Sequence, residues 1–367
     1  MRVVLTGGAT GGHIYPALAI GDAIRARDPE SEIIYIASGR PMEESIIPDH
    51  GYELHSVTTS PLDRRNVRKA AKTALMTLRG RKEALKIMKE FRPDVVVSTG
   101  SYVSVPAVLA GHSIGAAVYI HEQNGYPGVS NRMMARYAKK VFLGFEAARE
   151  YFPDKDKVIY SGNPVRSEFS GRDRTEDRRT LGIPEGDLVI VVFGGSLGSE
   201  TTNATGEAVA RAYAGREGYT VIWGTGSMYY DELTEKFREE GFAPGNVRIS
   251  AFIRNMPEIL SAADITISRS GALSTAEVTM VGRAAVFIPS PNVTADHQYY
   301  NAKAVADTGG AFIVREGGDT AGEVLQIIEA LDEDRDQIRS MEEASLKAAP
   351  VHAADIIVDT IMETYRD

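Results

Sequence analysis

Two glycine-rich segments of the sequence have the composition of anion-binding loops. Residues 6–13 read TGGATGGH and residues 193–199 read FGGSLGS, and each lies between an apolar run and a segment of helical period. Glycines let a backbone turn with positive φ and approach a ligand closely, and the first amides of a helix are unpaired donors. A tight turn without a ligand explains one such segment. The same arrangement in both halves of the chain predicts two cradles for phosphate or diphosphate groups.

The spacing of the first segment disfavours two common nucleotide sites. No Lys-Ser or Lys-Thr pair follows its glycines, as a P-loop requires, and the glycines do not fit G-x-G-x-x-G. Nucleotide hydrolysis and NAD chemistry therefore lose support. His13 ends the segment, where a neutral imidazole near the positive end of a helix can act as a general base, although a lone histidine is more often structural.

Three further polar segments follow apolar runs. Residues 268–277 end in Glu277, whose carboxylate suits the two hydroxyls of a ribose, although the helix dipole also favours a first-turn glutamate. Residues 296–302 carry amide and carboxylate side chains that suit sugar hydroxyls or polar helix caps. Residues 121–128 place four polar side chains before a turn, and because their spacing does not suit a metal we expect a binding loop without one.

The elements that position these residues follow from the alternation of apolar runs with segments of helical period. We expect strands at residues 3–6, 33–37, 95–98, 118–121, 141–143, 188–193, 220–223, 247–249, 265–268, 285–288 and 312–314. A first helix is expected over residues 15–27. This α/β pattern predicts two Rossmann-like, doubly wound domains whose strands end on facing walls of a cleft.

The domain boundary is expected at the Gly-Asn-Pro-Val-Arg break of residues 162–166, which a charged stretch follows. The expected domains are 1–163 and 164–345, and a C-terminal helix within 346–367 packs against either of them. A length of 367 residues fits two domains, and 43% hydrophobic with 25% charged residues is typical of globular proteins.

The sequence contains no cysteine, no signal-peptide pattern at its start and no apolar run long enough to cross a bilayer. We therefore expect a cytoplasmic protein whose contact with a membrane is peripheral. Between residues 64 and 92 there are eleven Lys or Arg and two Glu, a charge of +9 in a chain of net charge −9. A solvated helix face is the usual explanation, but the contrast with a remainder of −18 favours an anionic lipid surface over nucleic acid.

Taken together, these motifs resemble the MurG family of N-acetylglucosaminyl transferases. The matching strings are GGATGGHIYPALAI, HEQNGYPGVSNR, GNPVR, GGSLGS, SRSGALSTAEV and DHQYYNA, which occur in this order between residues 7 and 302. The resemblance implies a GT-B fold, UDP-N-acetylglucosamine as donor and undecaprenyl-pyrophosphoryl-N-acetylmuramoyl-pentapeptide as acceptor, at the cytoplasmic face of the cell membrane. It implies no cofactor.

The resemblance also implies roles for individual residues. His13 is the catalytic candidate, and the substrate-binding residues are Thr10, Gly11, Gly12, Tyr102, Asn124, Arg166, Ser196, Ile253, Ala272, Leu273, Ser274, Thr275, Ala276, Glu277 and Gln298. Thr10, Gly11 and Gly12 are expected at the diphosphate and acceptor side, His13 and Tyr102 facing the acceptor, and the others at the donor. The family usually has glycine where this chain has Ser101 and Val105, and Gln-Gly-Ala at residues 197–199.

The expected reaction is a single inverting displacement at the anomeric carbon, with the acceptor 4-hydroxyl as nucleophile and UDP as leaving group. A UDP-N-acetylglucosamine 2-epimerase resembles the same architecture and is the enzyme alternative, although it does not need a basic amphipathic segment. A non-catalytic UDP-sugar-binding protein is the alternative from another class, and it would bind UDP without turnover. A glycolipid synthase would differ only in its acceptor.

Overall fold

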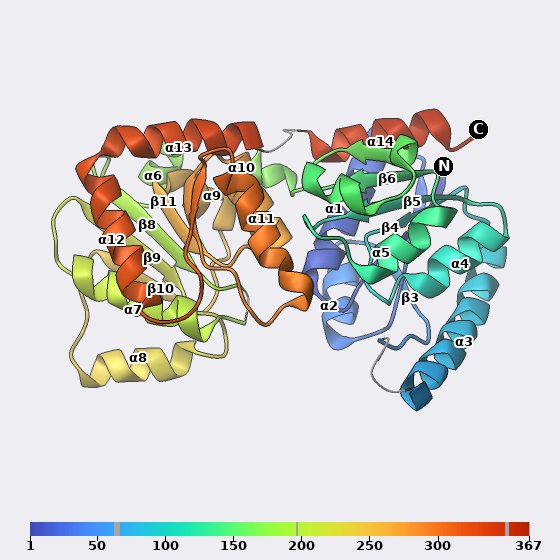
Figure 1. Ribbon diagram of the computed structural model, residues 1–367, viewed down its shortest axis with the longest axis horizontal. Helices are drawn as coiled ribbons and strands as arrows, with labels where there is room; N and C mark the ends of the chain where they lie inside the picture. The colour runs from blue at the N-terminus through green and yellow to red at the C-terminus, as the bar shows by residue number, and fades with distance from the viewer. Residues whose placement is uncertain (62–66, 196, 349–351, 367) are drawn as a thin grey trace. The chain divides into compact units, whose positions relative to one another are not determined.

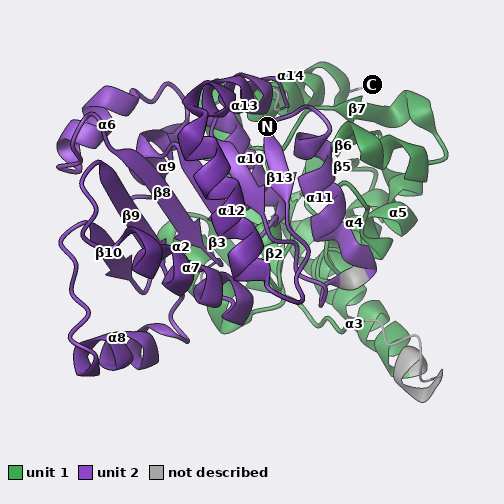
Figure 2. Cartoon of the chain, turned by 60° about the vertical axis from the view of Figure 1, so that its left-hand side comes forward, with its two compact units in different colours: residues 1–166, 352–367 green, residues 167–351 purple. Residues whose placement is uncertain are grey.

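The computed structural model describes residues 1–61, 67–195, 197–348 and 352–366, without the side chains of residues 67–71 and 294. The chain divides into two compact units, which are unit 1 (Met1–Arg166 with His352–Asp367) and unit 2 (Ser167–Val351), coloured green and purple in Figure 2. Unit 1 first ends at Arg166, within the Gly-Asn-Pro-Val-Arg segment in which the sequence analysis expects a boundary.

Unit 1 is built on a parallel sheet of seven strands in the order β3-β2-β1-β4-β5-β6-β7. The strands are β1 (Arg2–Thr6), β2 (Glu32–Ala37), β3 (Glu53–Ser56), β4 (Val95–Ser98), β5 (Ala117–Glu122), β6 (Lys140–Leu143) and β7 (Val158–Tyr160). The sequence analysis missed β3 and β7. β3 is polar and lies at one edge of the sheet, and β7 has three residues at the other edge, so neither gives a hydrophobic run.

Helices cover both faces of this sheet (Figure 1). The helices of unit 1 are α1 (Gly11–Arg27), α2 (Pro41–Asp49), α3 (Val67–Phe91), α4 (Val105–Ser113), α5 (Val129–Met134) and α14 (Ala353–Thr364), with 3-10 turns η1 (Ala135–Tyr137), η2 (Glu146–Tyr151) and η3 (Lys155–Lys157). Helices α1, α2 and α14 pack on the face that contains Val3 and Leu5. Helices α3, α4 and α5 pack on the face that contains Val4 and Val96, so both faces are buried, as parallel sheets require.

Unit 2 has the same plan, with six parallel strands in the order β10-β9-β8-β11-β12-β13. The strands are β8 (Leu188–Phe193), β9 (Tyr219–Gly224), β10 (Val247–Ser250), β11 (Ile265–Ser268), β12 (Ala284–Phe287) and β13 (Ala311–Ile313). The helices are α6 (Arg174–Thr180), α7 (Glu200–Tyr213), α8 (Tyr230–Glu239), α9 (Met256–Ala262), α10 (Ala272–Met280), α11 (His297–Ala306), α12 (Thr320–Glu333) and α13 (Arg335–Ala348), with 3-10 turns η4 (Ser167–Phe169) and η5 (Thr294–Asp296). The two doubly wound parallel-sheet domains expected from the sequence are thereby confirmed.

The start of the first helix differs from the expectation, and the packing of the C-terminal helix decides between the two domains. Helix α1 begins at Gly11 and not at residue 15, because Thr10 is its extended N-cap residue and the amide of Ile14 already donates to the Thr10 carbonyl. The C-terminal helix α14 packs on unit 1, where Ile357 and Ile361 are buried in the core and the Thr364 hydroxyl lies 2.7 Å from that of Tyr119. Residue 346, where the C-terminal segment was expected to begin, lies inside α13.

The strand order defines where each unit can hold a ligand. In unit 1 the chain winds outward in opposite directions from the neighbouring strands β1 and β4, and in unit 2 from β8 and β11. Ligands of open α/β sheets bind beyond the carboxyl ends of the strands at such a switch point. The loops that follow β1, β4, β8 and β11 are therefore the places to examine.

Candidate functional site

The loop after β1 carries the first glycine-rich segment and lies against the loop after β4. A Cβ atom on Gly7 would lie 2.0 Å from the Thr99 hydroxyl oxygen, so only glycine fits there. Thr99 is fully buried and donates its hydroxyl to the carbonyl of His13 at 2.6 Å. Thr99 was not among the residues predicted from sequence, although its place directly after a predicted strand was a usable signal. The contact fixes the backbone of His13 at the switch point of unit 1.

The His13 ring is oriented by Thr10. The Thr10 hydroxyl oxygen lies 2.9 Å from Nδ1 of His13, and the two residues flank Gly11 and Gly12 in the first turn of α1. When Nδ1 carries the proton and donates to Thr10, Nε2 keeps its lone pair and can accept a proton. The helix N-terminus, the two glycines and an imidazole base therefore meet in one loop.

Tyr102 follows β4 in the same region. Its hydroxyl is buried and has no hydrogen-bond partner among the described residues. Burial raises the pKa of Tyr102, and the guanidinium of Arg40, 5.7 Å from the ring centroid, opposes that shift. Ser101, where the resemblance implies glycine, has φ of 68°, a left-handed conformation that favours glycine.

The loop after β5 is held by a fully buried carboxylate. Glu122 accepts hydrogen bonds from the backbone and side-chain amides of Asn124 at 2.9 and 3.2 Å, and from the Gly128 amide and the Asn131 side chain at 2.9 Å each. Burial raises the pKa of Glu122, and these four hydrogen bonds oppose that shift. Asn124 is thus positioned by two bonds to one oxygen. The polar segment that the sequence indicates after this strand is therefore a loop ordered by hydrogen bonds to Glu122.

His121 and Gln123 tie this loop to the end of unit 1. His121 Nε2 lies 3.0 Å from the Gly162 carbonyl, and the Gln123 side-chain nitrogen lies 2.9 Å from His121 Nδ1. The Asn163 side chain donates to the Gln123 carbonyl at 3.0 Å. Arg166 is half-buried and lies three residues further on, at the last position of this part of unit 1.

The buried imidazole predicts how stability depends on pH. Burial lowers the pKa of His121 from 6.5 to about 4, so the fold holds the neutral ring while the unfolded chain is protonated near pH 6.5. The stability that depends on neutral His121 is complete above about pH 6.5 and is lost as the pH falls towards 4, a change of about 3 kcal/mol. Urea unfolding at pH 7 and pH 5 is expected to show a smaller difference in His121→Gln than in the wild type. Equal differences would contradict this.

In unit 2 the loop after β8 carries the second glycine-rich segment. Gly198 has φ of 87°, and a Cβ atom there would lie 2.2 Å from the backbone oxygen of Thr225, so two loops touch backbone to backbone. Ser199 caps α7, because its hydroxyl accepts from the Thr202 amide at 3.3 Å. Ser196, expected to bind the donor, lies outside the described residues. The loop presents the start of α7 at the switch point of unit 2.

Arg269 connects the loops that follow three strands of unit 2. Its Nε and Nη2 donate to the Ser199 hydroxyl oxygen at 3.0 and 2.7 Å, and its Nη1 donates to the Ile288 carbonyl at 3.0 Å. Nη1 also pairs with Glu316 at 2.6 Å. Arg269 lies within the 268–277 segment that the sequence singles out, but no role for it follows from sequence. The structure places its charge beside the N-terminus of α7.

Helix α10 begins directly after β11 and has no side-chain cap. Its N-cap residue is Gly271, with φ of −60° and ψ of 146°, so no side chain covers the first-turn amides. That turn contains Ala272, Leu273, Ser274, Thr275 and Ala276, with Glu277 next on the same helix and half-buried. An uncapped helix start favours an anion. Ile253 is buried beside the end of β9, where a Cβ atom on Gly224 would lie 3.0 Å from it.

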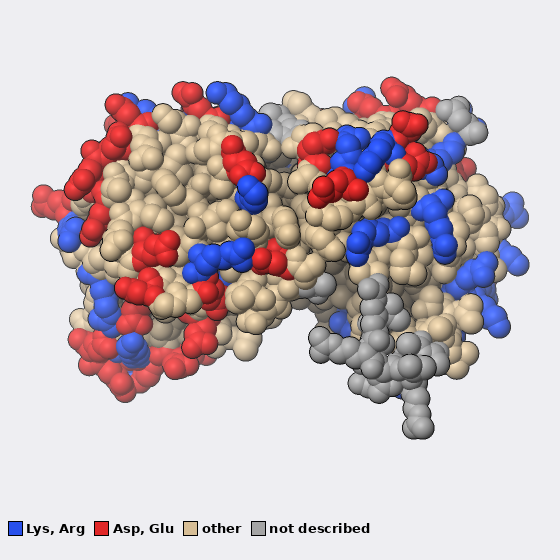
Figure 3. Space-filling model, viewed as in Figure 1, with Lys and Arg blue, Asp and Glu red and all other residues tan. Residues whose placement is uncertain are grey.

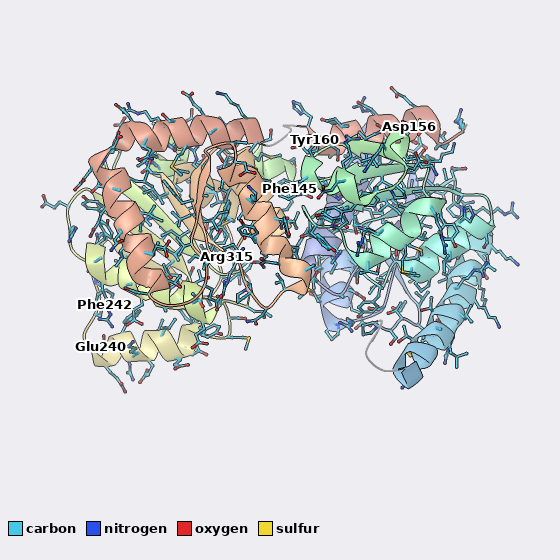
Figure 4. All side chains as sticks on the ribbon, in the orientation of Figure 1. Phe145, Asp156, Tyr160, Glu240, Phe242 and Arg315 are labelled. Carbon is cyan, nitrogen blue, oxygen red and sulfur yellow. The ribbon has the colours of Figure 1, made fainter. Side chains whose placement is uncertain are left out.

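The loop before α11 is strained and held in place. Ala295 and Asp296 have φ of 55° and 53°, which non-glycine residues rarely adopt. Arg315, labelled in Figure 4, donates to Asp296 at 2.9 Å and lies 3.8 Å from the ring centroid of Tyr299. Gln298 follows the strained pair, and its side-chain oxygen accepts from the Ser290 amide at 2.9 Å. Strain of this kind is typical of ligand-binding loops.

Each unit therefore collects its own set of predicted residues. Thr10, Gly11, Gly12, His13, Tyr102, Asn124 and Arg166 belong to unit 1, and Ile253, the 272–277 turn and Gln298 belong to unit 2. Unit 1 offers a base, amides and hydroxyls. Unit 2 offers two helix N-termini, a guanidinium and a carboxylate, a combination suited to a nucleoside diphosphate.

Both units match known families. The model described as Glycosyltransferase family 28 N-terminal domain matches residues 3–143, and the Glycosyltransferase family 28 C-terminal domain matches residues 189–357. A relative from Desulforudis audaxviator is 37% identical over 98% of both chains, and one from Bacillus cytotoxicus is 36% identical over 99% of both. Each is named UDP-N-acetylglucosamine--N-acetylmuramyl-(pentapeptide) pyrophosphoryl-undecaprenol N-acetylglucosamine transferase.

Solved structures resemble the chain over its full length. The MurG of Acinetobacter baumannii aligns with a TM-score of 0.77 at 27% identity and covers 99% of both chains. The UDP-GlcNAc 2-epimerase of Neisseria meningitidis bound to UDP-GlcNAc aligns with a TM-score of 0.71 at 14% identity, over 99% of this chain and 100% of the other. The second likeness is one of fold alone.

Proposed function

The chain belongs to the MurG family of the family 28 glycosyltransferases, and we infer that it transfers N-acetylglucosamine from UDP-N-acetylglucosamine to undecaprenyl-pyrophosphoryl-N-acetylmuramoyl-pentapeptide. The observation that carries this inference is the identity of 36% to 37% to transferases of that name over nearly the full length of both chains. The GT-B fold and the glycine-rich loops at both switch points, which suit phosphate groups, support it.

We propose that unit 2 binds the donor and unit 1 the acceptor. The amides at the starts of α7 and α10 suit the diphosphate, and Glu277 suits the ribose hydroxyls. Arg166 adds a positive charge for UDP, and Gln298 has the amide needed to read sugar hydroxyls. Asn124 belongs to unit 1 and is assigned to the donor sugar on the basis of the motif alone.

The proposed reaction is a single displacement with inversion. The acceptor 4-oxygen forms a bond to the anomeric carbon as the bond from that carbon to the diphosphate oxygen breaks. The proton of the 4-hydroxyl passes to Nε2 of His13, and UDP leaves with the bonding electron pair. The helix N-termini and Arg166 stabilise the negative charge that develops on the diphosphate.

We further propose that α3 docks on an anionic membrane surface. Leu75 and Leu78 are 69% and 55% exposed on this helix, and Lys72, Lys82 and Lys86 are exposed as well. Figure 3 shows Lys and Arg over the end of α3 beside α4, in contrast to the Asp and Glu over α8. Among the described residues no helix is long and apolar enough to span a bilayer. Arg64, Arg65 and the side chains of Arg68 and Lys69, part of the predicted basic segment, lie outside the description.

Charge reversal on α3 is expected to weaken membrane binding. Each basic side chain near an anionic surface contributes about 1 kcal/mol, so Lys82→Glu with Lys86→Glu is expected to lower partitioning onto anionic vesicles by at least about tenfold. Sedimentation with vesicles of phosphatidylglycerol and phosphatidylcholine measures this. Arg339→Glu with Lys347→Glu on α13 makes the same charge change at exposed positions and is expected to bind as the wild type does. Equal losses in both variants would overturn the assignment to α3.

The transfer itself is tested by UDP release with and without a short-chain lipid-linked muramoyl-pentapeptide. Release that depends on the acceptor, with a new disaccharide product, is the expected result. The epimerase alternative predicts turnover of the donor without the acceptor, and a non-catalytic UDP-sugar-binding protein predicts donor binding without any turnover. Either of these results would overturn the proposed function.

A further inference from the structure

Glu43 is a carboxylate with no exposed surface near the start of α2. It accepts hydrogen bonds from the backbone amides of Ala9 at 2.8 Å, Ser38 at 2.9 Å and Arg40 at 3.1 Å. The Ser38 hydroxyl lies 2.9 and 2.8 Å from its two oxygens. A buried charge is costly unless such bonds satisfy it, so this arrangement requires a reason.

Capping of its own helix does not explain the whole arrangement. The bonds to Ser38 and Arg40 stay within the loop that leads into α2, and exposed polar residues perform that task in most helices. The bond to Ala9 spans 34 residues and reaches the glycine-rich loop after β1. A Cβ atom on Gly8 would lie 2.3 Å from a carboxylate oxygen of Glu43, so the loop is shaped around this side chain.

The bond to Ala9 holds a strained residue. Ala9 has φ of 70°, a left-handed conformation that an alanine rarely adopts and that surrounding structure must enforce. The next residue is Thr10, the N-cap of α1, whose hydroxyl orients His13. A change in the backbone at Ala9 therefore changes the direction in which the chain enters α1, and with it the positions of Thr10 and His13.

We propose that Glu43 is a positioning residue for the transfer reaction, which holds Ala9 in the left-handed conformation so that Thr10 and His13 stay in their productive arrangement. Glu43 acts through the loop, because it contacts the glycine-rich segment at the Ala9 amide. The inference rests on the proposed function for its kinetic consequence. The loop geometry itself can be tested without any turnover.

Glu43→Gln provides the first test. Its side-chain NH2 group replaces one acceptor oxygen by a donor, which cannot pair with the backbone amides that donate to Glu43. Displacement of a catalytic group by about 1 Å costs about 100-fold, so kcat is expected to fall roughly 10- to 100-fold. KM for the donor and the affinity for UDP are expected to stay unchanged, since the residues assigned to the donor do not include His13 or Ala9. Glu43→Asp, whose shorter side chain retains the charge but withdraws from Ala9, is expected to lower kcat in the same way and serves if Glu43→Gln does not fold.

Ala9→Gly supplies the rescue. Glycine adopts positive φ without strain, so the loop no longer depends on the carboxylate, and Ala9→Gly is expected to restore kcat several-fold in Glu43→Gln or Glu43→Asp. Asp22→Asn, which removes a carboxylate that accepts from the Tyr52 hydroxyl at 2.6 Å elsewhere in unit 1, is expected to leave kcat unchanged. Wild-type kcat in both Glu43 variants, or no rescue by Ala9→Gly, would overturn the proposal.

A measurement without turnover separates this inference from the proposed function. The Ala9 amide, bonded to a buried carboxylate, is expected to exchange its hydrogen slowly in the wild type and faster in Glu43→Asp. Nitrogen chemical shifts of His13 are expected to report a changed tautomer balance in the same variant. If the wild-type protein shows no acceptor-dependent transfer but the exchange and shifts change in Glu43→Asp, the proposed function is wrong and the role of Glu43 in holding Ala9 is supported. Unchanged exchange and unchanged shifts in Glu43→Asp would overturn the proposal that Glu43 holds Ala9.

Discussion

Replacement of His13 by alanine is expected to slow transfer to the lipid-linked acceptor by roughly 100- to 10,000-fold, the range that general acid–base catalysis contributes. Thr10 lies 2.9 Å from Nδ1, and Thr99 fixes the His13 carbonyl, so the ring is oriented, and with the proton on Nδ1 it presents Nε2 as the proton acceptor. UDP affinity is expected to stay unchanged, because His13 is assigned to the acceptor hydroxyl and not to UDP. Rates of disaccharide formation at saturating substrates, with UDP titrations by calorimetry, measure both quantities.

Thr10 variants separate the chemistry of His13 from its placement. Thr10→Ser keeps a hydroxyl beside Nδ1 and is expected to retain most of the activity. Thr10→Val has the same shape without the hydroxyl and is expected to lose part of kcat, because the ring then lacks the hydrogen bond at Nδ1 that orients it. If His13→Ala retains most of the wild-type rate, the base is another group and the tautomer argument fails with it.

The regular part of the fold could be predicted because buried parallel strands leave a strong pattern in sequence. The inner strands of unit 2, β9, β8, β11 and β12, coincide with apolar runs and are almost fully buried. The edge strands β10 and β13 are only partly buried, and they could be predicted because their apolar residues still form a short run or alternate. Strands β3 and β7 lie at the edges of the other sheet. The side chains of β3 are exposed or only partly buried, and β7 has only three residues. Edge strands depend on pairing with a neighbour, and the neighbour is not visible in a local pattern.

The site could be predicted only where it consists of local motifs. The glycine-rich loops and the 268–277 segment are continuous in sequence, so their composition indicates their use. Thr99 and Glu43 contact the same loop from 86 and 34 residues away, and no local pattern connects them to it. Ser101 has a left-handed φ of 68°, a conformation that favours glycine, but a backbone angle is visible only in the structure.

Glu277 is expected to control the affinity for UDP. A hydrogen bond to a charged group is worth about 1.5 to 3 kcal/mol, so the loss of two bonds to a ribose diol in Glu277→Ala is expected to weaken UDP binding by about 100-fold or more. Glu277→Gln, whose amide presents one acceptor oxygen, is expected to have a UDP affinity between those of the wild type and Glu277→Ala. Calorimetric titration with UDP measures the series, and unfolding curves of each variant check that unit 2 remains folded.

A ligand change tests whether the carboxylate meets the ribose. Wild-type protein is expected to bind UDP more tightly than 2′-deoxy-UDP by about tenfold, the worth of one charge-assisted hydrogen bond. Glu277→Ala is expected to bind the two nucleotides equally, because the group that distinguishes them is gone. If Glu277→Ala weakens both ligands and still prefers UDP by the wild-type ratio, the carboxylate acts on the fold of α10 and another group recognises the 2′-hydroxyl. Glu277 is half-buried and lies one turn after the uncapped start of α10, directly after β11. A ligand whose phosphate is held at that helix start extends over the next turn, so we expect Glu277→Ala to bind the two nucleotides equally.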